Sequence, residues 1–357
     1  MTTLRASLVT PLTGSLAGFG RAGAAALNLW AGDPSGLPAG GVDLSVIDAH
    51  PEPAAAMRQA LAEGPEVIFG PYGSSPALEA IGATGRAVWN HGGASSALRR
   101  PRYPHAINVL APASTYLVGA LRAVRAADPA AATVSLLRGS TGFALDVAGG
   151  AVTEADALGF SIHVTGFDPG GATEAAASVP AADVLLVVGS FEDEMAAAGV
   201  LLERHWGAAA FVGAGVDEVL AELGDRREGL LGPAQWLAPA APAEPEEGPD
   251  AAWFTTAYRQ ATGHDPPYPA VAAFAAGVLC SRCLRDAGDP DDAAMLDAAR
   301  RLDTTTLFGR FRLDPDSGLQ AGHEVLTVQW QDGARRVVWP PGRAEPSLRY
   351  PISYRCP

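Results

Sequence analysis

Two short segments of the sequence combine glycines with hydroxyl side chains, Gly70-Pro-Tyr-Gly-Ser-Ser-Pro76 and Asn90-His-Gly-Gly-Ala-Ser-Ser96. Each follows a short apolar run, and the first also precedes a helix-like segment. Serine hydroxyls and free backbone amides at such places can bind an anionic group, although a serine that only caps a helix gives the same pattern. The carboxyl ends of parallel strands meet at one edge of a sheet, where open α/β folds bind small molecules. Two neighbouring loops of this kind therefore favour a small-molecule site.

Three other motifs favour structural interpretations. Gly18-Phe-Gly-Arg-Ala-Gly23 matches a dinucleotide fingerprint, but it begins eight residues after Thr10, the expected end of the first strand. In a Rossmann turn the glycines directly follow the strand. Cys280 and Cys283 lie within a helical pattern and offer only two of the four ligands that zinc needs. The segment 314–318 (DPDSG) resembles half of a calcium loop and is better explained as a tight turn.

The basic residues exclude several kinds of catalytic site. All 25 are arginine, and the sequence contains no lysine. Phosphate-binding GxxxxGK[ST] loops, pyridoxal-phosphate Schiff bases and protein-kinase sites all require a lysine. No GxSxG or HExxH motif occurs, so we predict no catalytic residues, no metal ligands and no cofactor. The net charge of -14 argues against nucleic-acid binding, which depends on clustered cations.

The elements that must position the two loops follow a βαβ rhythm. Short apolar runs alternate with alanine-rich segments of helical length through residues 4–127, and the rhythm restarts at residue 133. Two α/β units joined near residues 112–116 are therefore expected. A Pro-rich stretch at 238–249 reads as a linker before three more helices, and a final antiparallel hairpin is predicted around Asp332-Gly333.

The same patterns predict the individual strands and helices. Strands are predicted at 4–10, 43–48, 67–69, 87–90, 106–109, 133–137, 161–165, 184–188, 211–212, 230–231, 311–313, 325–331 and 337–339. Helices are predicted at 20–30, 52–63, 76–85, 114–127, 143–158, 191–205, 217–223, 251–262, 271–287 and 293–301.

The N-terminus contains neither an apolar signal region nor a cleavage site, and no apolar stretch is long enough to cross a membrane. We therefore expect no export signal within this sequence. We expect a cytoplasmic protein if Met1 is the natural start and an extracytoplasmic one if the start was trimmed.

Several segments, in this order along the chain, resemble the type I periplasmic-binding-protein family, specifically the branched-chain amino acid and amide receptors of ABC transporters. They are residues 10–20 (TPLTGSLAGFG), 67–75 (VIFGPYGSS), 89–96 (WNHGGASS), 232–236 (GPAQW), 268–277 (YPAVAAFAAG) and 309–314 (GRFRLD). Each is weak alone, but together and in this order they are specific, and the resemblance extends over nearly the whole chain.

The resemblance implies two Rossmann-like lobes with three hinge crossings and a ligand cleft. Lobe 1 would hold residues 1–115 and about 238–322, and lobe 2 residues 116–237 and about 323–357. It also implies a non-enzymatic solute-binding protein for an amino-acid-like, carboxylate or amide ligand, with an ABC permease as partner. A cytoplasmic sensor acting on a regulatory partner protein is the alternative, and a dinucleotide-dependent enzyme is a remote one. Neither nucleic acid nor membrane insertion is expected.

The resemblance also implies positions for the ligand-binding residues of lobe 1. Ser74 corresponds to the serine that binds the ligand carboxylate, and Gly93, Ala94 and Ser95 to the loop that contributes backbone and hydroxyl groups. Phe19 corresponds to the aromatic side chain that covers the ligand. We add Tyr72, which belongs to the same loop as Ser74.

Lobe 2 would contribute the aromatic side chains Phe143 and Phe191, which equally suit an ordinary core. Gly215 stands where amino acid receptors carry the acidic residue that pairs with the ligand ammonium. Asp217, two residues later, is a possible substitute. A ligand without an ammonium group is the other interpretation, because an unpaired buried ammonium is costly.

Overall fold

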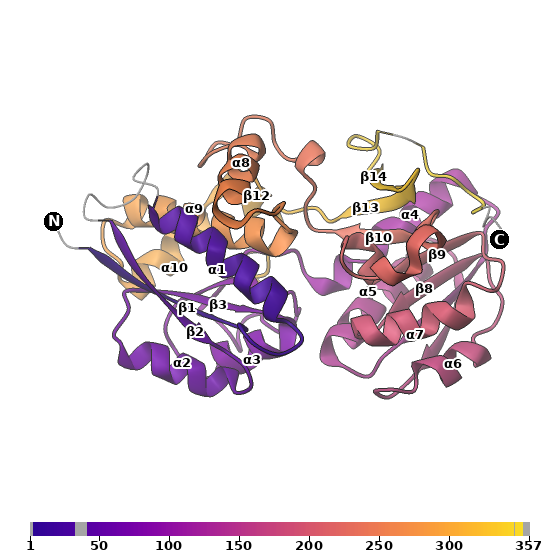
Figure 1. Cartoon of the computed structure of the whole chain (residues 1–357), viewed down its shortest axis with the longest axis horizontal. Helices are drawn as coiled ribbons and strands as arrows, with labels where there is room; N and C mark the ends of the chain where they lie inside the picture. The colour runs from indigo at the N-terminus through magenta and orange to yellow at the C-terminus, as the bar shows by residue number, and fades with distance from the viewer. Residues whose placement is uncertain (1–2, 33–40, 346, 353–357) are drawn as a thin grey trace. The chain divides into compact units, whose positions relative to one another are not determined.

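The structure is a computed structural model that describes residues 3–32, 41–345 and 347–352 (Figure 1). The chain divides into two compact units, each assembled from two separate stretches. Unit 1 contains Met1–Pro112 and Trp236–Glu324, and unit 2 contains Ala113–Gln235 and Val325–Pro357. The chain therefore passes from one unit to the other three times.

Unit 1 is built on a five-stranded parallel sheet with the order β2-β1-β3-β4-β5. Its strands are β1 (Leu4–Thr10), β2 (Val42–Asp48), β3 (Val67–Tyr72), β4 (Val88–Gly92) and β5 (Ala106–Asn108). Its helices are α1 (Ala17–Gly32), α2 (Pro53–Ala62), α3 (Ser74–Gly82), α8 (Ala251–Thr262), α9 (Tyr268–Ala287) and α10 (Asp292–Arg301). A separate hairpin consists of β11 (Asp303–Thr306) and β12 (Gly309–Arg312).

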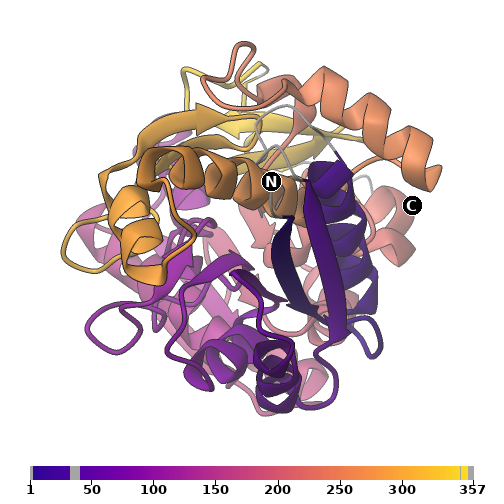
Figure 2. The same ribbon diagram turned by 90° about the vertical axis from the view of Figure 1, so that its left-hand side faces the viewer.

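Helices cover both faces of this sheet. Buried side chains of α2 and α3, such as Met57 and Ile81, form one cluster with Val9, Ile68 and Val88 of the strands. The opposite face carries α1 and α9, which pack closely against each other (Figure 2). Burial of these apolar side chains supplies the main stabilisation of the unit.

The contact between α1 and α9 depends on a glycine. A Cβ atom at Gly277 of α9 would lie 2.5 Å from the Trp30 ring of α1. The Trp30 ring also stacks edge-on against Phe69 of β3, with ring centroids 5.2 Å apart. Because Gly277 has no side chain, the Trp30 ring can fill the space between α9 and the sheet.

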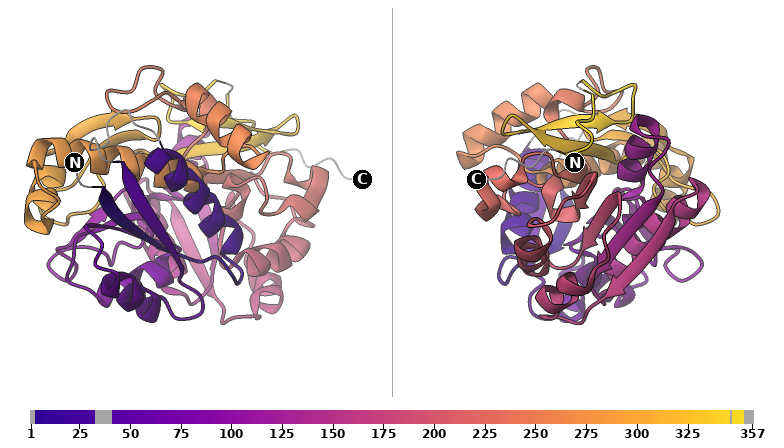
Figure 3. Two further views of the ribbon diagram at one scale, coloured as in Figure 1. Left: turned by 60° about the vertical axis from the view of Figure 1, so that its left-hand side comes forward. Right: turned by 90° about the vertical axis from the view of Figure 1, so that its right-hand side faces the viewer.

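Unit 2 is built on a seven-stranded mixed sheet with the order β14-β13-β10-β9-β8-β6-β7 (Figure 3). Its strands are β6 (Thr133–Arg138), β7 (Ser161–Gly166), β8 (Val184–Val188), β9 (Ala208–Phe211), β10 (Leu231–Ala234), β13 (Leu326–Gln331) and β14 (Ala334–Trp339). Its α-helices are α4 (Val118–Ala127), α5 (Gly142–Ala157), α6 (Ala172–Ser178) and α7 (Phe191–Leu201). Its 3-10 helices are η1 (Ala113–Thr115), η2 (Val212–Gly215) and η3 (Ala221–Arg227), while η4 (Ala238–Ala240) belongs to unit 1.

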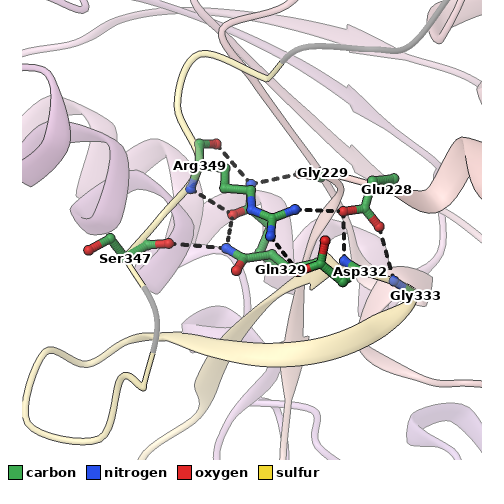
Figure 4. Close-up of polar contacts among 8 residues, drawn as sticks. Glu228, Gly229, Gln329, Asp332, Gly333, Ser347 and Arg349 are labelled. Atoms are coloured by element: carbon green, nitrogen blue, oxygen red, sulfur yellow. Dashed lines mark hydrogen bonds and ion pairs between the residues drawn. The ribbon is translucent and has the colours of Figure 1, made fainter.

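The described C-terminal segment of unit 2 is held by a polar cluster (Figure 4). The buried amide of Gln329 donates to the carbonyl oxygens of Gly229 and Arg349 and accepts from the Arg349 backbone amide at 2.9 Å. The Arg349 guanidinium forms ion pairs with Glu228 and Asp332. This cluster joins the end of the chain to the β13–β14 hairpin and to the entrance of β10.

The structure confirms the predicted α/β organisation and the hairpin turn. Asp332 and Gly333 both have positive φ, 56° and 74°, as an Asp-Gly hairpin turn requires. The predicted helix at 217–223 is wrong, because residues 216–220 form bends and turns before η3 begins at Ala221. Helix α6 and strand β11 have no counterpart among the predicted elements. Within the described ranges, no helix combines the length and apolar character needed to span a bilayer.

Candidate ligand-binding site

The loops that follow β1 and β3 in unit 1 flank a reversal of strand order. From β1 the chain proceeds to β2 on one side, and from there it returns to β3 on the other. Loops that diverge at such a switch point leave a crevice at the carboxyl ends of the two strands, which is where open α/β sheets bind ligands. Phe19 lies in α1, which follows β1, while Tyr72 ends β3 and Ser74 begins α3, so these predicted site residues flank that point.

Ser74 is the first residue of α3, and its hydroxyl makes no hydrogen bond to any described residue. The first amides of an α-helix have no acceptor within the helix and carry a partial positive charge. The adjoining β4 loop contacts this helix end, since the Gly73 amide donates to Gly92 O at 3.0 Å. The N-terminus of α3 therefore offers neutral donors beside the second glycine-rich loop.

In the second loop, Gly93 forms hydrogen bonds within the loop, whereas two neighbouring backbone amides do not. The Gly93 amide donates to Asn90 Oδ1 at 2.9 Å, and Gly93 O accepts from Asn90 Nδ2, so this residue serves the loop itself. The Ala94 and Ser95 amides donate to no other described residue. Ser95 Oγ accepts from the Ala97 amide at 3.2 Å, which leaves its hydroxyl hydrogen available.

Aromatic rings lie next to these donors. The Phe19 and Tyr72 ring centroids are 4.8 Å apart, and the Tyr72 and Tyr268 hydroxyls are hydrogen bonded at 2.8 Å. Burial and the adjacent Tyr72 raise the pKa of the Tyr268 phenol well above its usual value, so Tyr268 remains neutral. Tyr268 was not among the predicted site residues, although it begins the resembling segment 268–277.

Gly20 and Gly23 of the Gly18–Gly23 motif allow close packing around a helix. The motif lies inside α1, and a Cβ atom at Gly20 would lie 1.8 Å from the carbonyl oxygen of Pro11. Gly23 faces His91 of β4, whose ring carbon would lie 3.3 Å from a Cβ atom there. These contacts support the interpretation of the motif as a glycine-punctuated entry into a helix.

His91 is an unexpected feature of this region. Its side chain is 1% exposed, and neither ring nitrogen has a hydrogen-bond partner among the described residues. Burial lowers the pKa of His91 to about 4, so the ring is neutral at physiological pH. No spacing in the sequence distinguishes this histidine from the other six.

Unit 2 has its own switch point, between β6 and β8. Phe143 lies in the first turn of α5 after β6, and Phe191 begins α7 after β8. Both rings are partly exposed, and Phe143 packs edge-on against Tyr116 with centroids 5.7 Å apart. The structure therefore places the two predicted aromatic residues at equivalent points of this sheet.

Asp217 is tied to the C-terminal hairpin of its own unit. Its carboxylate forms an ion pair of 2.7 Å with Arg335 of β14, and a second Arg335 nitrogen donates to Gly215 O. A Cβ atom at Gly215 would lie 1.7 Å from the carbonyl oxygen of Pro233, so the backbone excludes any side chain at residue 215. Arg335 was not among the predicted site residues, because no local spacing links it to the loop after β9.

Glu194 is a second residue that sequence reasoning missed. It is 1% exposed, and it accepts hydrogen bonds from the Gly213 amide at 2.7 Å and the Gly189 amide at 3.4 Å. Burial raises its pKa to about 8, although these two bonds oppose the shift. Glu194 thus connects the loops that follow β8 and β9.

A family model described as "Periplasmic binding protein" matches residues 3–335, nearly the whole chain. The chain belongs to the periplasmic binding protein family. The resemblance inferred from the sequence is thereby confirmed. A comparison with curated proteins gives no significant match.

Solved structures of periplasmic binding proteins share the fold. A leucine binding protein from Thermotoga maritima is 17% identical with a TM-score of 0.77, covering 94% of this chain and 97% of its own. A Rhodopseudomonas palustris solute binding protein in complex with 3,4-dihydroxybenzoic acid is 18% identical with a TM-score of 0.75, covering 93% and 95%. Another from R. palustris, in complex with 4-hydroxybenzoate, is 15% identical with a TM-score of 0.78, covering 94% and 95%.

The family comprises ligand-binding receptors of ABC transporters, and the ligands of these neighbours include amino acids and aromatic acids. Among the described residues, no group of three or more His, Cys, Asp or Glu side chains is placed to hold a metal ion. Cys280 and Cys283 are both buried, free thiols within α9, and the Asp314 carboxylate accepts from the amide and hydroxyl of Ser317 in a tight turn.

Proposed function

We propose that this chain is a solute-binding protein that captures a small carboxylate, amide or amino-acid-like ligand and serves as receptor for an ABC-type uptake system. The main support is the group of neutral donors that follow β3 and β4 of unit 1. The Ser74 hydroxyl and the Ala94 and Ser95 amides make no hydrogen bonds to other described residues. Charge-assisted hydrogen bonds from such donors can hold an anionic oxygen without a cation.

Aromatic side chains would supply the apolar contacts to the ligand. Phe19 and Tyr72 would contact the apolar part of the ligand from unit 1, and Phe143 and Phe191 from unit 2. We propose that units 1 and 2 are the two lobes, and that ligand binding favours a closed arrangement which the permease recognises. The three chain crossings after Pro112, Gln235 and Glu324 are then the hinge.

Calorimetric titration of the purified chain against a panel of small carboxylates, amides and amino acids tests this function. At least one ligand should bind and raise Tm, and Ser74→Ala should weaken its affinity by roughly 10-fold to 100-fold, the loss expected for one charge-assisted hydrogen bond. Ser75→Ala is the matched control, because Ser75 is the exposed neighbour in the same helical turn.

Two outcomes would contradict the proposal. A panel without any ligand that binds would argue against solute binding by this chain. A ligand whose affinity falls equally in the Ser74 and Ser75 variants would show that the N-terminus of α3 is not its binding site.

A further inference from the structure

The loop after β4, residues 93–98, is held at both ends by buried asparagine side chains. Asn90 is 0% exposed, and it binds both backbone groups of Gly93. Its Oδ1 accepts from the Gly93 amide at 2.9 Å, and its Nδ2 donates to Gly93 O at 2.7 Å. Asn108 ends β5 and is 3% exposed, and its Nδ2 donates to Leu98 O at 3.1 Å. The backbone amides between these two ends, including those of the candidate site, are therefore positioned by the two asparagines.

The two asparagines are bonded to each other, and the donors of both side chains are fully used. Asn90 Nδ2 donates to Asn108 Oδ1 at 2.9 Å. A primary amide has two N–H donors. Those of Asn90 go to Gly93 O and to Asn108, and those of Asn108 go to Leu98 O and to Gly318 O at 3.0 Å. Neither buried side chain can turn without leaving a carbonyl oxygen unpaired, which is costly.

The bond to Gly318 extends this network to the part of the chain that leads to the third crossing. Gly318 lies 210 residues from Asn108 in the sequence and shortly before Glu324, where the chain leaves unit 1. Gly318 also ends a tight turn, in which its amide donates to Asp314 O at 2.8 Å. The position of the Gly318 peptide is thus set by the turn on one side and by Asn108 on the other.

Gln320 connects the same segment to the first crossing. It is 4% exposed, and its Nε2 donates at 3.3 Å to the carbonyl oxygen of Val109, which shortly precedes the crossing after Pro112. Its Oε1 accepts from the amides of Gly322 and His323 at 2.8 and 3.3 Å. One buried amide side chain thus fixes the backbone near two of the places where the chain leaves unit 1.

We propose that Asn90 and Asn108 are positioning residues that couple loop 93–98 to the segments of unit 1 that lead to the first and third crossings. This inference rests on the proposed function, because it assigns a consequence to ligand binding at that loop. A ligand that fixes the loop amides in one position also selects one arrangement of the asparagine network, since neither side chain has a spare donor. Through Gly318, the network then favours one position of the segment before the third crossing.

Asn108→Leu tests the network in the ligand-free chain. Leucine fills a similar volume but makes no side-chain hydrogen bonds, so the three buried groups bound by the Asn108 side chain lose their partner. Hydrogen exchange of segments 93–98 and 318–323 should then become at least about 10-fold faster relative to β1 of the same unit. Asn108→Ser is a smaller change that allows the same measurement if the leucine variant does not fold.

Ile107→Ala is the matched control. Ile107 is the buried neighbour of Asn108 on β5, and successive side chains of a strand point to opposite faces of the sheet. Its truncation weakens the same strand without removing a side-chain hydrogen bond of the network. Exchange in this variant should rise no more in segments 93–98 and 318–323 than in β1.

Ligand binding gives a readout that a merely structural role would not change. The probe is whichever of leucine, alanine, benzoate, 4-hydroxybenzoate and acetamide binds the wild-type chain most tightly in calorimetric titration. Binding should slow hydrogen exchange at 318–323 as well as at 93–98, both in the wild type and in Ile107→Ala. In Asn108→Leu, the slowing at 318–323 should be at least about 5-fold smaller, because the network that couples the two segments is interrupted.

The outcomes separate the two proposals. Exchange that rises uniformly over unit 1 in Asn108→Leu, as in Ile107→Ala, would overturn the coupling whether or not a ligand binds. Binding that leaves exchange at 318–323 unchanged in the wild type, or slows it equally in Asn108→Leu, would overturn the coupling and leave the solute-binding function intact. Failure of every probe to bind would overturn the proposed function, and the coupling with it.

Discussion

His91 of unit 1 and Glu194 of unit 2 are both buried ionisable side chains beside the loops of the candidate site, but they are of opposite type. His91 of unit 1 is a base without a hydrogen-bond partner among the described residues. Glu194 of unit 2 is an acid that accepts from two backbone amides. Burial favours the neutral form of each. Burial should therefore make the stability of the two units respond to pH in opposite directions.

The direction of each response follows from proton linkage. The pKa of His91 falls from 6.5 to about 4, so its contribution to the stability of unit 1 is complete above pH 6.5 and is lost as the pH falls through 4. The pKa of Glu194 rises from 4.5 to about 8, so its contribution to unit 2 is complete below pH 4.5 and is lost as the pH rises through 8. Acid should weaken unit 1, and base should weaken unit 2.

The largest effect is expected at Glu194. Between pH 4.5 and pH 8, unit 2 should lose stability on the order of 5 kcal/mol from this group, since each pKa unit corresponds to about 1.4 kcal/mol. Hydrogen exchange of peptides from β8 and β9, corrected for intrinsic rates, measures this loss separately from unit 1. Glu194→Gln cannot titrate and should flatten the pH profile. A wild-type profile that matches that of the variant would contradict the assignment.

His91 should give the next largest effect. Acidification from pH 6.5 to pH 4 should cost unit 1 on the order of 3 kcal/mol, because the charged ring cannot be hydrated in its buried position. Hydrogen exchange of peptides from β3 and β4 detects this change.

His91→Leu is the informative variant for that measurement. It removes two unpartnered polar atoms, so unit 1 should be at least as stable as the wild type at pH 7 and should lose its acid sensitivity. His105, whose ring Nε2 donates to Ile81 O at 3.0 Å, is the control position, and His105→Leu should retain the acid response. Equal acid responses in wild type and His91→Leu would contradict the assignment of the acid sensitivity of unit 1 to His91.

Local features of the two units could be predicted from the sequence, whereas contacts between distant residues could not. Strands and loops were found because apolar periodicity and glycine spacing are local properties, and Ser74 and Ser95 were selected in this way. The roles of Arg335, Tyr268 and Glu194 depend on contacts with residues far along the chain or on complete burial. The helix at 217–223 was wrongly predicted for the same reason. Arg335, which lies far along the chain, holds this loop through Gly215 and Asp217.

The units differ further in how their distant chain segments are joined. Unit 1 relies on apolar packing between α1 and α9, whereas unit 2 holds its C-terminal segment through the polar cluster around Gln329. Gln329→Met should cost about 2 kcal/mol, because Gly229 O and the backbone groups of Arg349 would lose their buried partner. Hydrogen exchange of peptides from β10 and β13, which belong to the same sheet, measures this change.

Arg349→Met gives the smallest expected effect, and it separates the contribution of the exposed ion pairs from that of the buried Gln329 amide. The Arg349 side chain is 49% exposed, so loss of its ion pairs with Glu228 and Asp332 should cost no more than about 0.5 kcal/mol. Its backbone hydrogen bonds to Gln329 remain in this variant, so the segment should stay in place. If Arg349→Met destabilised unit 2 as much as Gln329→Met, the exposed ion pairs rather than the buried amide would hold the C-terminal segment.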